Sequence, residues 1–208
     1  MKRDKPPPRL LLESIRIQDG IPDLLPYHQE RMDRSRRALY PKSPVLKLKK
    51  ILEQIDLPGA GCFKLRLQYE AKLVAHELVP YAPTPVSSVR IIDADDLRYG
   101  RKYADRQAIK THFARRGDCD EILMIQRGHV TDTSYANVAL YDGSHWYTPA
   151  WPLLRGTRRE KLIQEGTLRA YMIRERDLGN FEKMRLVNAM LPWGTGPEVG
   201  MKEVRRIG

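Results

Sequence analysis

The chain has 208 residues, of which 41% are hydrophobic and 30% are charged. That length suffices for one large domain or two small ones with a sizeable core. No apolar run approaches the roughly 18 residues of a membrane-spanning helix. The two cysteines, Cys62 and Cys119, form no closely spaced pair of the kind that disulfide frameworks and zinc sites use. We therefore expect a protein of the reducing cytoplasm that neither binds a metal nor works at a membrane.

The formal net charge of +11 favours anionic partners, which range from nucleic acid to small phosphorylated or carboxylated ligands. Aromatic residues make up only 8% of the chain, and they are not interleaved with the basic clusters as base-stacking platforms are. A basic nucleic-acid-binding module is therefore an alternative that the aromatic pattern does not support. Charge by itself does not decide between these partners.

The first part of the chain predicts a strand over residues 9–18, which Asp19-Gly20 ends. A helix follows from about Pro26, in a first-turn position that proline tolerates. A second amphipathic helix is expected over roughly 44–55, with lysines outward. The inward face of the first helix carries, at helical spacing, His28, Arg31, Met32, Ser35 and Leu39. That of the second carries Val45, Leu48, Ile51, Leu52 and Ile55.

Residues 62–69 and 73–80 alternate and face each other across a short turn, which predicts a β-hairpin. The proline-rich stretch that follows, residues 80–85, is typical of a linker. We therefore expect a small α/β domain over residues 1–83, made of a strand, two helices and a hairpin, and a larger domain over 84–208.

The second part alternates strands with helices, which indicates an α/β or α+β fold of two small domains. Its expected strands cover residues 88–93, 121–126, 130–141, 145–148 and 168–174. Its expected helices cover about 104–116 and the segment after Gly156, and a short helix plus a strand then reaches Met190.

Arg31 stands out because it shares a helix face with Met32 and Leu39, which should be buried. An inward guanidinium needs an anion or several acceptors. The alternatives are an arginine at the boundary whose head reaches solvent, or an ion pair with Glu13 on the neighbouring strand.

Lys102 lies between Gly100 and the expected helix, with Arg106 four residues further on. A nearby cation and partial burial both favour the neutral amine that Schiff-base chemistry needs. The alternative is a solvated lysine, of which this chain has many.

Asp132 sits among β-branched and small residues directly after a Gly-His turn, and a carboxylate on a half-buried strand needs a cation or a donor. The alternative is a surface strand on which Asp132 points at water. Further on, Gly156-Thr157-Arg158-Arg159 opens a helix, and the exposed N–H groups of such a terminus attract anions. The alternative there is an ordinary turn with basic residues.

Several segments, in order, resemble the fold-type-IV pyridoxal-phosphate (PLP) enzymes, which comprise branched-chain and D-amino-acid aminotransferases and aminodeoxychorismate lyases. The resemblance covers roughly residues 10–192 of a chain that would be a short member. The segments are Glu13-Ser-Ile-Arg16, His28-x-x-Arg31-Met, Lys102-x-x-x-Arg106, Asp120-Glu121-Ile-Leu, Val130-Thr-Asp-Thr-Ser-Tyr-Ala-Asn137, Tyr147-Thr-Pro149, Leu154-x-Gly156-Thr-x-Arg159 and Asn188-Ala-Met-Leu-Pro192. Asp132 stands where the family usually has glutamate, and Arg158 replaces a threonine.

The resemblance implies a two-domain fold like that of D-amino-acid aminotransferase, with a small α/β N-terminal domain and a larger pseudo-barrel domain that binds the cofactor. It also implies the catalytic residues: Lys102 as the Schiff-base lysine and general base, and Asp132 as the partner of the pyridine nitrogen. The expected cofactor-binding residues are Arg31, Lys102, Arg106, Asp132, Asn137, Thr157, Arg158, Ala189 and Met190.

The resemblance further implies a homodimer that acts on a small amino-group substrate, and the excess of positive charge suits an anionic one. The segment at 188–192 is especially similar to the lyase branch, so we expect release of pyruvate and 4-aminobenzoate from 4-amino-4-deoxychorismate. An amino-acid aminotransferase of the branched-chain or D-amino-acid type, and a PLP-binding relative without catalysis, remain alternatives.

Overall fold

The computed structural model describes residues 9–206, which fold into two compact units. Of these residues, the first unit comprises 9–81 together with Arg101–Asp105, and the second comprises 82–100 and 106–206. The sequence predicted a boundary after residue 83, whereas the chain changes unit after Tyr81 and passes back through the first unit at residues 101–105. No helix within residues 9–206 is long and apolar enough to cross a membrane.

The first unit is built on a four-stranded sheet in the order β2-β1-β3-β4. Its strands are β1 (Leu11–Gln18), β2 (Ile21–Pro22), β3 (Cys62–Tyr69) and β4 (Leu73–Pro80). The β3–β4 hairpin has the predicted bounds, and β1 pairs antiparallel with β3 along its whole length. Alternate residues of β1 are fully buried on one face, and one of them is the carboxylate residue Glu13.

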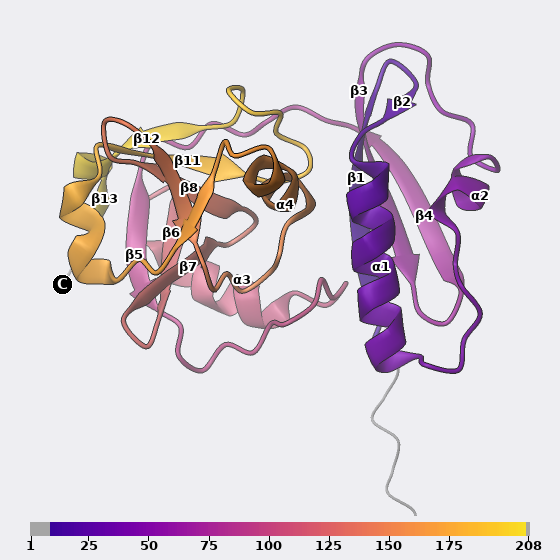
Figure 1. Ribbon diagram of the computed structural model, residues 1–208, viewed down its shortest axis with the longest axis horizontal. Coiled ribbons are helices and arrows are strands. Elements are labelled where there is room, and N and C mark those ends of the chain that lie inside the picture. The colour runs from indigo at the N-terminus through magenta and orange to yellow at the C-terminus, as the bar shows by residue number, and fades with distance from the viewer. Residues whose placement is uncertain (1–8, 207–208) are drawn as a thin grey trace, which may run out of the picture. The chain divides into compact units, whose positions relative to one another are not determined.

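Helix α1 (Leu25–Leu39) runs alongside this sheet (Figure 1) and carries Pro26 in its first turn, as predicted. Met32 from α1 packs into a core with Ile15 and Leu67 of the sheet. His28, Arg31 and Ser35 lie on the same buried face of the helix. The predicted inward face of α1 is therefore confirmed, although Leu39 at its end is only half-buried.

Helix α2 (Leu48–Leu52) is much shorter than the predicted helix over 44–55. Side chains of α1 hold the preceding residues in an extended path: Gln29 bonds to Leu46 O and to Leu48 N, and Arg36 donates to Pro44 O. These tertiary bonds override the local helical pattern. As a result Val45, which the pattern placed inward, is 69% exposed.

The predicted helix over 104–116 also begins late, as α3 (Gln107–Phe113), which a 3-10 turn over Ala114–Arg116 continues. The cause is a backbone contact with the edge of β1. Lys102 O accepts from Leu12 N at 2.9 Å, and Ala104 N donates to Leu10 O at 2.8 Å. Residues committed to this pairing cannot also form a helical turn.

The second unit contains a nine-stranded mixed sheet whose main path runs β10-β9-β8-β7-β6-β5-β13, with β11 on β8 and β12 on β11. Strand β5 is parallel to β6 and β13, and β9 is parallel to β10, whereas the other pairs are antiparallel. The strands are β5 (Val89–Asp93), β6 (Glu121–Gln126), β7 (His129–Thr133), β8 (Asn137–Tyr141), β9 (Trp146–Pro149), β10 (Arg169–Tyr171), β11 (Lys183–Val187), β12 (Glu198–Gly200) and β13 (Val204–Arg205).

The prediction of one strand over 130–141 is wrong, because the chain turns back on itself at residues 134–136. Thr133 closes this turn: its hydroxyl donates to Ala136 O and accepts from Ala136 N, both at 3.1 Å. Strands β7 and β8 then lie antiparallel, with Asp132 opposite Asn137. The short strand β10 likewise replaces a longer prediction over 168–174.

The helices of the second unit are few: α3, α4 (Thr157–Gln164) and short 3-10 turns at Glu175–Asn180 and Met201–Glu203, besides the one after α3. A core of aliphatic side chains, among them Leu123, Val138 and Leu186, fills the interior of the sheet. The expectation of a mixed α/β fold in two parts is confirmed.

Candidate functional site

Asp132 lies on β7 and is only 5% exposed, so it does not point at water. Its carboxylate accepts hydrogen bonds from the Asn137 side-chain amide at 2.7 Å and from the Leu154 N–H at 2.9 Å. Burial raises the pKa of the Asp132 carboxyl to about 7, although these two bonds and the charge of Arg159 lower it part of the way back. Both donors are neutral, which leaves the buried carboxylate ready to accept a cationic partner.

Asn137 connects this carboxylate to the segment that leads into α4. Its amide nitrogen donates to Asp132 and also to Leu154 O at 2.7 Å. A Cβ on Gly156 would lie 2.1 Å from the Asn137 side-chain oxygen, so only glycine fits there. The Asn137 side chain and the start of α4 are thus packed against each other.

The first turn of α4 is buried, contrary to the solvated face that a run of arginines suggests. Thr157 is 2% exposed, and its hydroxyl has no hydrogen-bond partner within residues 9–206. Gly156 occupies the N-cap position and offers no side chain to the free N–H groups. Such a terminus favours an anion.

The two arginines in the first turn of α4, Arg158 and Arg159, donate hydrogen bonds to different segments of the second unit. Arg158 is buried and donates to Ala189 O at 3.4 Å, which brings the turn at 188–190 to the start of α4. The Met190 N–H in that turn is taken by the Asn188 side chain at 2.8 Å. Arg159 instead donates hydrogen bonds to two residues of β9, at the Thr148 hydroxyl and at Pro149 O.

In the first unit, Glu13 is the centre of a buried cluster. Its carboxylate accepts from His28 Nδ1 at 2.6 Å, from Arg31 Nε at 3.0 Å and Nη2 at 2.5 Å, and from the Tyr69 hydroxyl at 3.4 Å. Although burial raises the pKa of the Glu13 carboxyl, Arg31 and His28 outweigh it and hold the pKa at about 2. The ion pair that the sequence left open for Arg31 is therefore formed.

The two predicted groups near residues 102–106 belong to different units. Lys102 is held by its backbone against β1 in the first unit, and its charge lowers the pKa of His28, which burial already lowers. Arg106 belongs to the second unit, where it donates to Ser134 O in the turn between β7 and β8. Ser134 in turn donates to Glu121 at 2.7 Å.

The structure thus gathers the predicted residues in two sets, one in each unit. Asp132, Asn137, Thr157, Arg158 and the turn at 189–190 are connected in the second unit, while Arg31 and Lys102 lie in the first. The sequence did not predict that Glu13 and His28 would form a buried hydrogen-bonded cluster with Arg31. The signal was present, because Glu13 is a carboxylate on an inward strand face opposite an inward helical His-x-x-Arg pair.

The chemistry of the site suits PLP. A buried carboxylate with neutral partners suits a protonated ring nitrogen, and an uncapped helix start with an unpartnered buried hydroxyl suits a phosphate. No group of three His, Cys, Asp or Glu side chains within residues 9–206 could hold a metal ion.

Comparison with known proteins also points to a family of PLP-dependent enzymes. The model of the amino-transferase class IV family matches residues 10–195. An uncharacterized protein of Haemophilus influenzae is 38% identical over 183 residues, which is 86% of this chain and 97% of that protein. The structure of a candidate 4-amino-4-deoxychorismate lyase from Haemophilus somnus is 31% identical, with a TM-score of 0.82 over 88% of this chain and 96% of that chain.

A further likeness is one of fold. An aminotransferase from Brucella abortus, solved with its cofactor PLP, is 16% identical, with a TM-score of 0.72 over 92% of this chain and 80% of that chain. The match of the family model over most of the chain, and the 38% identity to a relative covered almost completely, decide the assignment. The chain belongs to the amino-transferase class IV family of PLP-dependent enzymes.

Proposed function

We propose that this enzyme cleaves 4-amino-4-deoxychorismate, or a closely similar anionic amine, to pyruvate and an aromatic amine such as 4-aminobenzoate. The observation that carries the PLP part of the proposal is the buried Asp132 carboxylate with two neutral donors. The lyase part is supported by the Asn188-Ala-Met-Leu-Pro192 segment and by the 31% identity to a candidate lyase.

Asp132 is the proposed partner of the ring nitrogen. When bound, PLP supplies an electron sink for charge that develops at the substrate Cα. An ionised Asp132 keeps a proton on the ring nitrogen, because the opposite charge favours the protonated form. Asn137 and Leu154 N–H fix the direction of the carboxylate, which is one methylene shorter than the family's usual glutamate.

The phosphate is proposed to bind at the start of α4, where the N–H groups of Thr157 and Arg158 and the Thr157 hydroxyl are available. The turn at Ala189 and Met190, which Arg158 holds in place, would add to this set. Arg31, whose charge Glu13 balances, is proposed as a further residue that binds the cofactor.

Lys102 is proposed as the residue that holds the cofactor covalently and, once released by the substrate amine, carries the Cα proton. The Lys102 backbone carbonyl accepts a hydrogen bond from Leu12 N, which would restrict the positions that the side-chain amine can reach. Arg106 is proposed as a positioning residue that stabilises the turn after Asp132 through Ser134 O.

A transaminase is the second candidate, because the family is named for transamination and both reactions begin at the same Cα proton. The two are distinguished by assaying pyruvate release from 4-amino-4-deoxychorismate beside transfer from a panel of amino acids to 2-oxoglutarate. We expect pyruvate release, and its loss in Lys102→Ala. Amino-group transfer without pyruvate release would show that the enzyme is an aminotransferase and not a lyase. No activity in either assay, with the cofactor bound, would indicate a non-catalytic relative.

The proposal includes a cytoplasmic homodimer acting on a small anionic substrate. The charge of +11 suits a dicarboxylate. Light scattering should give the mass of two chains, about twice 24.1 kDa; the mass of one chain would contradict the dimer.

A further inference from the structure

Around Asp132 the pairing of β7 with its two neighbouring strands is short and irregular. On one side β7 pairs with β8 through a single register pair, Asp132 opposite Asn137. On the other side the register with β6 shifts between Leu123 and Ile125. Such an irregularity leaves backbone groups of the ladder unpaired and bends the strand. The position of Asp132 therefore depends on side-chain contacts as well as on the sheet.

Glu121, the first residue of β6, supplies one of these contacts. Its buried carboxylate accepts hydrogen bonds from the Ser134 N–H at 3.2 Å and from the Ser134 hydroxyl at 2.7 Å, besides the N–H of Ile122 at 2.7 Å. Burial raises the pKa of the Glu121 carboxyl, although these donors and the charge of Arg106 lower it part of the way back. A costly buried carboxylate is thus used to hold two groups of one residue, Ser134, in the turn between β7 and β8.

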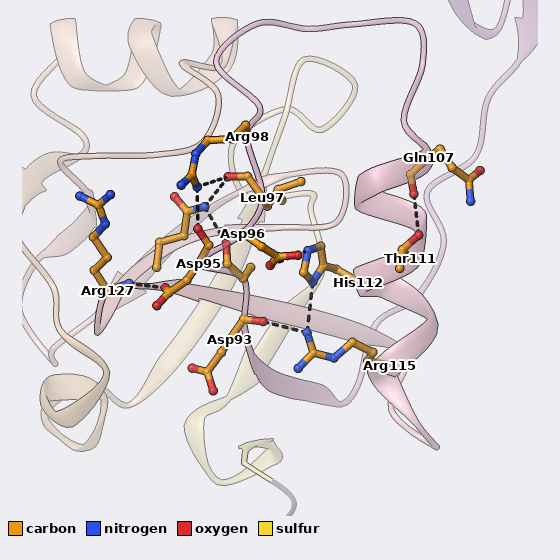
Figure 2. A network of polar contacts seen from close by, with 12 residues as sticks. Asp93, Asp95, Asp96, Leu97, Arg98, Gln107, Thr111, His112, Arg115 and Arg127 are labelled. Atoms are coloured by element: carbon orange, nitrogen blue, oxygen red, sulfur yellow. Dashed lines mark hydrogen bonds and ion pairs between the residues drawn. The ribbon is translucent and has the colours of Figure 1, made fainter.

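The third polar group of Ser134 is held from a different element. Its carbonyl accepts a hydrogen bond from Arg106, which is the N-cap residue of α3. Figure 2 shows how α3 is attached to the end of β5: Arg115 Nη1 donates to Asp93 O at 2.8 Å. A carboxylate on β6 and a guanidinium at the start of α3 therefore fix the turn together, and all of these residues lie in the second unit.

We propose that Glu121 is a positioning residue of the cofactor site. By holding Ser134, it keeps the Asn137 amide in place on the Asp132 carboxylate. The inference rests on the proposed role of Asp132. Ser134 lies two residues after Asp132 and three before Asn137, so a displaced Ser134 moves both ends of the turn. The 2.7 Å hydrogen bond between those ends then weakens, because such bonds depend steeply on their angle.

The contacts indicate that Glu121 acts through its length and not through its charge. Glutamine has the same length: its oxygen can accept from the N–H groups of Ile122 and Ser134, and its amide can donate to the Ser134 hydroxyl, which also accepts. Aspartate keeps the charge but is one methylene shorter, which takes its oxygens out of hydrogen-bond range of the turn. Glu121→Gln and Glu121→Asp therefore separate length from charge.

The first measurement uses the cofactor-free protein. In NMR of protein labelled with ¹⁵N-asparagine, the Asn137 side-chain amide is assigned by its loss in Asn137→Ala. We expect its signal to stay unchanged in Glu121→Gln and to shift in Glu121→Asp. Ser134→Ala, which removes only the hydroxyl donor and leaves the buried carboxylate intact, should shift it less and in the same direction. A signal that stays unchanged in Ser134→Ala or in Glu121→Asp overturns the inference.

Asp120→Ala is the matched control. Asp120 precedes Glu121 in the chain and also accepts from a serine N–H and hydroxyl, those of Ser88 at 3.1 and 3.3 Å, but it does so away from the turn between β7 and β8. We expect this variant to leave the Asn137 amide signal unchanged. A shift as large as that of Glu121→Asp would show a general loss of structure and would contradict a specific role of Glu121.

The second measurement uses PLP labelled with ¹⁵N at the ring nitrogen, whose chemical shift distinguishes a protonated from a neutral ring. Wild type and Glu121→Gln should keep the ring nitrogen protonated. Glu121→Asp should lower the protonated fraction, and Asp132→Asn should lower it further. A loss in Glu121→Gln as large as in Glu121→Asp overturns the inference, because charge would then be the cause. If Asp132→Asn leaves the ring signal unchanged, the proposed role of Asp132 itself fails, and the inference with it.

Discussion

The Asn137 amide donates a 2.7 Å hydrogen bond to the Asp132 carboxylate across the turn that joins β7 to β8. Because the same nitrogen also holds Leu154 O, one side chain joins the carboxylate strand to the segment before α4. The orientation of Asp132 and the position of the helix start therefore depend on each other, as the proposed cofactor site requires.

Gly156→Ala tests this dependence. The added Cβ would lie 2.1 Å from the Asn137 side-chain oxygen and would push the amide away from Asp132. We expect the free energy of unfolding to fall by about 1–3 kcal/mol, and the cofactor to bind more weakly. Gly179→Ala is the control, because a Cβ there meets nothing within 4 Å. Equal behaviour of the two variants in chemical denaturation would contradict the packing argument.

The raised pKa of Asp132 predicts a pH effect on the stability of the cofactor-free protein. Its folded pKa of about 7 lies above the ordinary 3.8, so between these values the folded state binds more protons than the unfolded state. The free energy of unfolding then falls as pH rises from 4 to 7, by on the order of 3–4 kcal/mol from this group. Asp132→Asn cannot titrate, so its difference from wild type isolates the effect from Glu13 and His28. A difference that is independent of pH would show that Asp132 titrates normally.

Lys102 should carry the cofactor. The protein expressed with excess PLP should absorb in the visible range, and borohydride followed by peptide mapping should place the adduct on Lys102. Lys102→Ala should lose the band, whereas Lys110→Ala, which changes an exposed lysine of α3, should keep it. An adduct on another lysine would contradict the assignment.

Arg31 requires a double variant, because its removal alone leaves Glu13 as a buried unpaired charge, which costs about 3–5 kcal/mol of stability. Glu13→Gln with Arg31→Met removes both charges and should leave folding nearly unchanged. Loss of the phosphate contact should then weaken cofactor binding by about 2–3 kcal/mol, or roughly 30- to 150-fold. Unchanged cofactor affinity in a titration of the double variant would mean that Arg31 serves the fold alone.

The sequence predicted elements whose cause is local and missed those whose cause is distant. The β3–β4 hairpin has the expected bounds because alternation and turn residues define it. The expected helix over 44–55 was overridden by bonds from Gln29 and Arg36, which no local pattern contains. The break between β7 and β8 is closed by hydrogen bonds that join the backbone and the hydroxyl of Thr133 to Ala136, which the alternation of residues does not reveal.

Within the candidate site, too, the sequence predicted features with local causes and missed those that depend on tertiary contacts. Asp132 and the helix start at Gly156 were found from local chemistry, namely a carboxylate on a strand and free N–H groups. The connection between them through Asn137 and the pairing of Glu13 with Arg31 depend on tertiary contacts. Residue type and spacing suggested each partner, but not which hydrogen bonds would form.

The final prediction separates the two roles that Asp132 could have. If it tunes the ring, Asp132→Ala should lower turnover far more than it lowers cofactor occupancy, because the phosphate contacts and Lys102 still hold the cofactor. Occupancy is read from the visible band, and turnover from pyruvate release with 4-amino-4-deoxychorismate. Asn137→Ala is the informative companion: it keeps the carboxylate group but removes one of the donors that orient it, so we expect a smaller loss of turnover. Should Asp132→Ala lose cofactor and turnover in equal measure, the carboxylate would be a binding residue, and its buried position would owe nothing to the electronics of the ring.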